Sequence, residues 1–174
     1  MAARDDEGFR SYVIARQRSL RHVAFLMCGD WHQADDLVQS TLTRLYAAWH
    51  RVTREQGPDA YAHRILANLV IDERRRPWRR EVSVDQIDDR NLRFAGPSPP
   101  DERLDLMDAL GRLPRRQRVT LVMRFWMDAS VSETADAMGC TAGTVKSQTA
   151  KGLNNLRALL GDGRTLAGAI EEDS

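Results

Sequence analysis

The amino-acid sequence predicts an all-α protein made of two small helical domains joined by a flexible linker. Apolar side chains recur at helical spacing in several segments, and 42% hydrophobic residues suffice for packed cores in 174 residues. Between them, residues 82–101 are poor in apolar side chains and contain three prolines. We therefore expect domains at 1–80 and 103–160, a linker at 81–102 and a frayed acidic tail at 161–174.

Three helices are expected in the first domain. The first covers about residues 9–27 and ends at Gly29. The second follows Asp30, which can cap it. A polar break at 51–59 precedes the third helix, which we expect to begin after Asp59 and to end before Pro77.

The second helix is amphipathic. Its apolar face, which predicts Trp49 in the core, consists of Ala34, Leu37, Val38, Thr41, Leu45, Trp49 and Val52. Its opposite face carries Asp35, Asp36, Gln39, Thr43 and Arg44.

An arginine cluster closes the first domain. Arginines at a helix C-terminus have a structural explanation, because they interact favourably with the helix dipole. Five of them around one tryptophan exceed that need, and Arg can hold phosphates while Trp stacks on bases. Contact with nucleic acid is therefore predicted for Arg74, Arg75, Arg76, Trp78, Arg79 and Arg80.

The second domain is expected to begin with a short helix capped by Asp101, followed by a helix over 115–127. Val119, Val122, Met123 and Trp126 would face inward in the latter. Its first turn carries Arg115, Arg116 and Arg118, although cations oppose the dipole at a helix N-terminus. We expect a negative group outside the fold, such as a phosphate, to resolve that conflict.

Residues 130–160 predict a helix-turn-helix, with an ordinary helical hairpin as the alternative. Ser130 and Glu133 have capping-box spacing, Gly139 can end the first helix, and Thr141 can cap the second. The second helix opens with small and hydrogen-bonding side chains, which suit the major groove of DNA.

Composition and motifs argue against other classes of function. Residues 103–160 carry nine basic and five acidic side chains, which favours nucleic-acid contact. The sequence lacks both an apolar run of about 20 residues and a secretory signal, so we expect a cytoplasmic protein. Cys28 and Cys140 are isolated and should be semi-buried thiols without a metal. Without catalytic motifs, neither an enzyme nor a cofactor is expected.

Both halves resemble one family. DDLVQSTLTRLY (35–46) and YAHRILANLVIDERRR (61–76) resemble region 2 of group IV (extracytoplasmic function, ECF) sigma factors of RNA polymerase, in the sigma-70 family. LGRLPRRQRVTLVMRFWMDASVSETADAMGCTAGTVKSQTAKGLNNLR (110–157) resembles their region 4. ERRRPWRRE and VKSQT are most similar to an actinobacterial, SigE-like group. The resemblance covers about residues 9–160.

The resemblance implies a transcription initiation factor that directs core RNA polymerase to promoters with −10 and −35 elements. Its partners would be promoter DNA and the β′ clamp helices and β flap of polymerase, without membrane insertion. The resemblance leaves open whether an anti-sigma factor is a further partner. Residues 51–59 match the family's loop that captures an extruded base of the −10 element.

Three groups of site residues follow from the resemblance. Polymerase contacts fall on Asp35, Asp36, Leu37, Val38, Gln39 and Arg44. Contacts to the −10 element fall on Asn68, Arg74, Arg75, Arg76, Trp78, Arg79 and Arg80. Contacts to the −35 element fall on Arg115, Arg116, Arg118, Thr144, Lys146, Ser147, Gln148 and Lys151.

Some positions depart from the family's pattern. Many relatives have Arg at Gln148 and an apolar residue at Thr149, so the usual −35 preference does not carry over. Thr134 replaces a common aliphatic residue, which should loosen the packing of its helix.

Two alternatives remain. One is a helix-turn-helix regulator that is not a polymerase subunit, which would not need the segment 35–46. The other is a protein-binding adaptor, which would not explain the arginine clusters.

Overall fold

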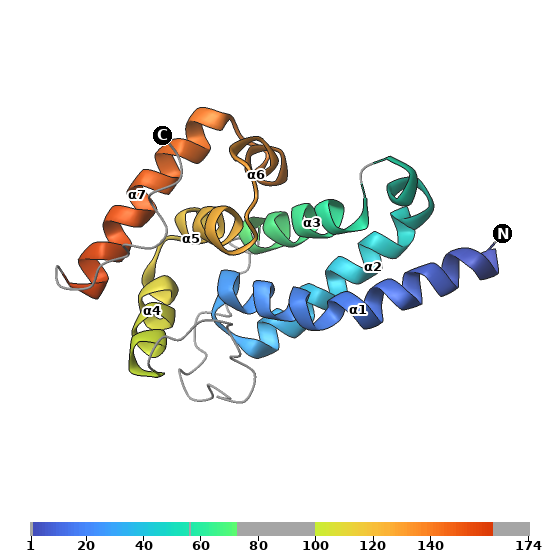
Figure 1. Cartoon of the computed structure of the whole chain (residues 1–174), viewed down its shortest axis with the longest axis horizontal. Helices are drawn as coiled ribbons and strands as arrows, with labels where there is room; N and C mark the ends of the chain where they lie inside the picture. Colours follow the sequence, from blue (N-terminus) through green and yellow to red (C-terminus); the bar gives the residue numbers. More distant parts are fainter. Residues whose placement is uncertain (1, 56, 73–99, 162–174) are drawn as a thin grey trace.

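The computed structural model describes residues 2–55, 57–72 and 100–161, and within them the regular structure is helical, without strands (Figure 1). The all-α prediction is confirmed. The N-terminal helices are α1 (Ala2–Cys28), α2 (Trp31–Glu55) and α3 (Pro58–Asp72). The C-terminal helices are α4 (Pro100–Arg112), α5 (Arg115–Leu121), the π-helical segment η3 (Val122–Trp126), α6 (Val131–Met138) and α7 (Ala142–Leu160).

The core of the N-terminal helices follows the predicted periodicity. All seven residues of the apolar face of α2 are buried, and all five residues of its polar face are exposed. Trp49 is 7% exposed, and its ring contacts those of Phe9 and Tyr12 at centroid distances of 5.2 and 5.4 Å. The prediction that Trp49 is a core residue is therefore confirmed.

The predicted polar break at 51–59 is too long, because only residues 56–57 separate α2 from α3. Helix α2 continues to Glu55 because Val52 extends its buried face, and Gly57, with φ of 78°, donates its amide to Val52 O at 3.1 Å. Pro58 then opens α3, so Asp59 lies in the first turn of that helix instead of preceding it. A base-capturing loop over 51–59 is not present in this arrangement, since most of that range is helical.

A second difference concerns the helix expected over 115–127. It changes from α-helical to π-helical geometry at Val122, and Met127 donates its amide to Val122 O, five residues earlier, at 3.0 Å. The wider turn shifts the phase of the side chains that follow it. Val122 and Met123 are buried as predicted, whereas Trp126, predicted to face inward, is 48% exposed.

The two sets of helices share one core, which the prediction of two domains on a flexible linker did not anticipate. Figure 1 shows α5 and α6 beside α3, and the contacts between helices agree. Side chains from α5, η3 and α6 belong to the same buried cluster as those of α1, α2 and α3: Val119, Val122, Met123, Ala137 and Met138. The arginine cluster at 74–80 and most of the predicted linker and tail lie outside the described residues, and 100–102 belong to α4. The domain boundaries stay predictions.

Helix α7 packs closely on α5 at Gly152, which is buried. A Cβ atom at this position would lie 3.1 Å from Leu121 Cγ and 3.4 Å from Gln117 Cβ. Only a glycine allows this approach without a shift of the neighbouring side chains. Figure 1 shows α7 beside α5 and α4, and the contacts between these helices agree.

We predict that Gly152→Val lowers the free energy of unfolding by about 1–3 kcal/mol, the usual cost of overpacking. Chemical denaturation followed by circular dichroism measures this change. Gly143→Val is the matched control on the same helix, because its Cβ would meet only Thr141 Oγ1 at 3.8 Å. Equal destabilisation by the two variants would contradict the packing argument.

Candidate functional site

The outer face of α2 presents four of the six residues predicted to contact polymerase. Asp35, Asp36, Gln39 and Arg44 are exposed. Leu37 and Val38 are 6% and 3% exposed and belong to the core. In this structure those two residues hold α2 in place, and the four polar side chains are the ones that a partner can reach.

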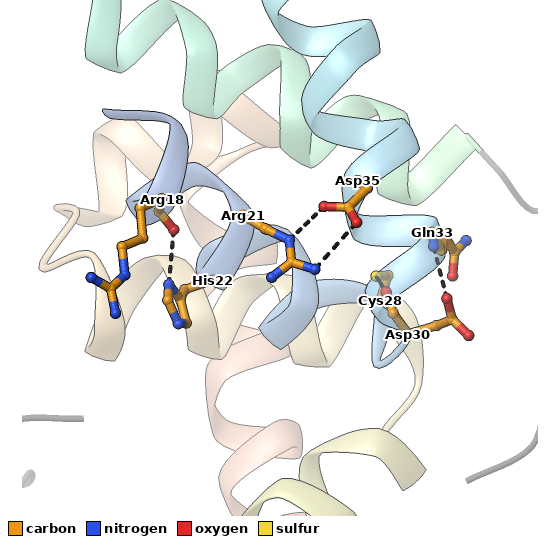
Figure 2. Close-up of polar contacts among 7 residues, drawn as sticks. All are labelled: Arg18, Arg21, His22, Cys28, Asp30, Gln33 and Asp35. Atoms are coloured by element: carbon orange, nitrogen blue, oxygen red, sulfur yellow. Dashed lines mark hydrogen bonds and ion pairs between the residues drawn. The ribbon is translucent and has the colours of Figure 1, made fainter. Parts of the chain in front are cut away.

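Asp35 is held by a residue that sequence reasoning missed. Figure 2 shows the Arg21 guanidinium of α1 facing the Asp35 carboxylate, with Nε–Oδ1 and Nη2–Oδ2 distances of 2.5 and 3.2 Å. Arg21 also lies over the Trp31 ring, 4.5 Å from its centroid, and that ring stacks on Phe25 at 4.0 Å. Bidentate pairing and stacking fix the guanidinium plane and thereby the carboxylate. No local pattern links positions 14 residues apart, so only the packing of α1 on α2 reveals the pair.

The start of α2 is capped as its sequence predicts. Gln33 donates its backbone amide to Asp30 Oδ1 at 2.7 Å (Figure 2). This bond satisfies one of the amides that the first turn of a helix leaves without an intrahelical acceptor. Asp30 therefore stabilises the start of α2.

The helix-turn-helix geometry of α6 and α7 also follows its local signals. Glu133 N donates to Ser130 Oγ at 3.1 Å, and Ser130 N donates to Glu133 Oε2 at 2.7 Å, which completes the capping box. These bonds hold the pKa of Glu133 below its ordinary value, chiefly through the Ser130 backbone amide. Gly139 ends α6 with φ of 60°, and Thr141 Oγ1 accepts the Thr144 amide at 3.1 Å.

The first half of α7 has a polar, accessible face and a buried face. Lys146, Ser147 and Lys151 are exposed, whereas Val145 is fully buried. Thr144 and Gln148 are half-buried at the border between the two faces. The five predicted −35 residues of α7 thus lie on its accessible side or at its edge.

Thr134, which was expected to loosen α6, is fully buried, and its hydroxyl donates to Ser130 O at 2.8 Å. A buried hydroxyl without a partner would cost stability, and this bond avoids that cost. Thr134 therefore forms a buried hydrogen bond at the start of α6, which the expectation of looser packing did not include.

An external anion was expected to pair with all three arginines at the start of α5, and the structure contradicts this for two of them. Arg116 is exposed. Arg115 Nη1 instead donates to Val70 O in α3 at 3.0 Å. Arg118 is only 5% exposed, and its Nε donates to Leu26 O in α1 at 2.5 Å. In this arrangement Arg118 does not reach a DNA backbone.

Burial is the main cause that lowers the pKa of Arg118 to about 10; Cys28 opposes this shift, and the neighbouring Arg115 contributes to it. A guanidinium with this pKa still carries its charge at neutral pH. The charge is therefore buried against backbone carbonyls, which are its hydrogen-bond acceptors.

The residues predicted to bind the −10 element are described only in part. Asn68 is half-buried in α3. Arg74, Arg75, Arg76, Trp78, Arg79 and Arg80 lie outside the described residues. Cys28 and Cys140 are half-buried and form no disulfide, and the described part of the chain holds no group of His, Cys, Asp or Glu side chains arranged to bind a metal.

Comparison with known proteins identifies the family. The sequence-family model of sigma-70 region 2 matches residues 9–80, and the family model of sigma-70 region 4 matches residues 103–156. The RNA polymerase sigma-E factor of Streptomyces avermitilis is 34% identical over 95% of this chain and 92% of its own length. The chain belongs to the ECF group of the sigma-70 family, since it is also 30% identical to the ECF sigma factor EcfG of Rhodopseudomonas palustris over 88% of this chain and 86% of that one. The sigma-E factor of Streptomyces coelicolor is 36% identical to this sigma factor over 86% of the chain and 84% of its own length.

A solved structure has the same fold as this sigma factor. The sigma factor RpoE of Bartonella quintana, in complex with the anti-sigma factor NepR, superposes with a TM-score of 0.72. It is 24% identical, and the match covers 91% of this chain and 99% of that one. The matching family models describe two regions of sigma factors, and the relatives named above are RNA polymerase sigma factors. Across residues 2–55, 57–72 and 100–161, no helix combines the length and apolar content that a membrane crossing requires.

Proposed function

We propose that this sigma factor binds core RNA polymerase and directs it to promoters through separate −10 and −35 contacts. The observation that carries the proposal is the order of two matching regions, 9–80 and 103–156, on one chain. A helix-turn-helix regulator that never joins polymerase would leave the region 2 match unexplained. The protein acts in the cytoplasm, where the chromosome is transcribed, and has no catalytic activity of its own.

The outer face of α2 forms the polymerase contact in this proposal. Asp35, Asp36, Gln39 and Arg44 are exposed together, and α2 packs on α1 and α3 through its other side. The arrangement offers two carboxylates to the β′ clamp helices, and Arg21 holds one of them in place.

The −35 contact comes from α7 in this proposal. Its exposed Lys146, Ser147 and Lys151 supply donors and cations, and Thr144 and Gln148 border them. Arg116, exposed in the first turn of α5, adds a phosphate contact. The −10 contact is assigned to Asn68 and to the arginine cluster that follows α3.

We expect transcription by purified core polymerase to depend on this protein at its own promoters. Run-off assays with reconstituted holoenzyme on a genomic promoter library, followed by sequencing of the transcript starts, measure this dependence and identify the promoter. Omission of the protein is the control. Absence of initiation across the library would overturn the proposed function.

Asp36→Arg should weaken binding to core polymerase by about tenfold or more, or about 1.4 kcal/mol, because it reverses a charge in the proposed contact. Titration of labelled protein with core enzyme measures the affinity. Glu7→Arg is the matched control, since Glu7 is exposed on α1 and the charge change is the same. If both variants bind equally well, with unchanged circular dichroism, the contact does not include Asp36.

Gln148→Arg should shift the preferred −35 base from adenine towards guanine by about tenfold, because Gln pairs with adenine and Arg with guanine. Competition binding with −35 duplexes substituted at each position measures the shift. Asn154→Arg adds the same charge at an exposed position further along α7 and should raise affinity without changing the preference. An unchanged preference in the Gln148 variant would exclude it from base readout.

A further inference from the structure

A side-chain hydrogen bond joins α7 to α5 near the surface. Asn155 Nδ2 in α7 donates to Gln117 Oε1 in α5 at 2.7 Å. Asn155 is exposed and Gln117 is half-buried. The two residues lie 38 positions apart in the sequence, so no local pattern links them. We call this contact the amide pair.

The amide pair lies next to the close approach of α7 to α5. Gly152 precedes Asn155 by about one turn, and a Cβ atom at Gly152 would lie 3.4 Å from Gln117 Cβ. Leu121 of α5 and Leu156 of α7 belong to one buried apolar cluster beside it. Gln117 therefore meets α7 twice, through its Cβ at Gly152 and through its amide oxygen at Asn155.

Apolar contacts and a hydrogen bond constrain two helices differently. Burial of apolar surface holds α5 and α7 together, but its attraction has no preferred direction. A hydrogen bond weakens steeply when its angle falls below about 120° or its donor and acceptor leave the range of about 2.7–3.2 Å. The amide pair is therefore a directional contact, which restricts the rotation and the shift of α7 along α5.

The amide pair lies on the same stripe of α7 as the predicted base contacts. Residues three or four positions apart share one face of a helix. This spacing places on one stripe Thr144, Gln148, Lys151 and Asn155. The first three are assigned to the −35 element in the proposed function, and the fourth ties the end of their stripe to α5.

On α5, the amide pair adjoins a proposed phosphate contact. Arg116, which is exposed, directly precedes Gln117 in the first turn of that helix. Phosphate contacts set the position of a protein on the duplex, and base contacts read the sequence from that position. A shift of α7 by the rise of one residue, about 1.5 Å, exceeds the roughly 0.5 Å range of good hydrogen-bond distances. The register of α7 on α5 therefore decides which base edge Gln148 meets.

We propose that the amide pair fixes the register of α7 on α5 and thereby sets the base preference at the −35 element. The proposal rests on the proposed function, because it assumes that α7 reads this element. Gln117 and Asn155 are positioning residues, which act through Gln148 and Lys151 instead of touching a base. Their bond adds little to stability, because it is exposed and water competes for both amides.

This role differs from a direct phosphate contact by Gln117. Loss of a phosphate contact lowers the affinity for every duplex by the same factor. Loss of register lowers the affinity for the preferred duplex most, so the base preference falls. The two truncations break the same bond, and their effects on the preference therefore do not add.

Gln117→Ala, Asn155→Ala and the double variant test the proposal in the full chain. Alanine keeps the Cβ atom of Gln117, so the packing of that atom beside Gly152 is retained. Asn154→Ala is the matched control, because Asn154 is exposed next to Asn155 and the same amide is removed.

Two measurements are made on each variant, together with the midpoint of chemical denaturation. Competition binding with duplexes substituted at each −35 position of the promoter found by transcript sequencing gives the base preference. Residual dipolar couplings of the backbone amides give the orientation of α7 relative to α5 without DNA.

We expect each alanine variant of the amide pair to lose about fivefold in base preference, the lower end of what one good base contact contributes. The double variant should lose no more than either single variant. The couplings of α7 should change while the denaturation midpoint stays at its wild-type value. Asn154→Ala should keep the wild-type preference and couplings.

An unchanged base preference in both single variants would overturn the proposal, as would an equal loss of affinity for all duplexes or additive effects in the double variant. Unchanged couplings would overturn it without DNA. If Gln117→Ala lowers the denaturation midpoint, Asn155→Ala decides alone, because Asn155 is exposed. Failure of the proposed function would show differently, as a wild type that binds no −35 duplex and initiates no transcription, whereas the couplings still report on the amide pair.

Discussion

Hydrogen bonds from arginines at the start of α5 to backbone carbonyls of α1 and α3 determine how the two sets of helices meet. The buried end of α1 needs donors from elsewhere in the chain, and Arg118 supplies one. Arg115 donates to Val70 O in α3, and the position of both arginines at the start of α5 would be unfavourable without such partners. The same contacts thus satisfy acceptors in one half of the molecule and remove an electrostatic conflict in the other. The shared apolar cluster, with Val119 and Met138 among its members, closes around them.

Helix α2 combines structural and functional roles because its two faces are cleanly separated. Eight buried residues fix the helix on α1 and α3, and this leaves the acidic positions 35 and 36 exposed. Arg21 then pairs with Asp35 from the neighbouring helix. An exposed ion pair adds little stability, but a bidentate one restricts where the carboxylate points. The outer face is therefore partly ordered before any partner arrives.

The sequence was informative wherever a structural feature depends on residues within one or two turns. Helical periodicity predicted the buried face of α2, and cap residues predicted the capping box at Ser130, the left-handed Gly139 and the role of Thr141. It was misleading where a polar composition suggested a loop. Residues 51–55 stay helical because Val52 is buried against the core, and burial outweighs the low apolar content around it. The exposure of Trp126 was missed because the π-helical turn that contains it has no clear signature in the sequence.

Local patterns were sufficient to establish the helical class, the helix-turn-helix and, by resemblance, the sigma-factor family, since each rests on short-range spacing or on ordered motifs. Three-dimensional packing alone established that the two sets of helices share a core, that Arg118 is buried, and that Arg21 holds Asp35. The reason is the range of the interactions involved. Arg118 finds its acceptor 92 residues away, and whether an arginine faces a carbonyl or a phosphate depends on which helix end is brought to it.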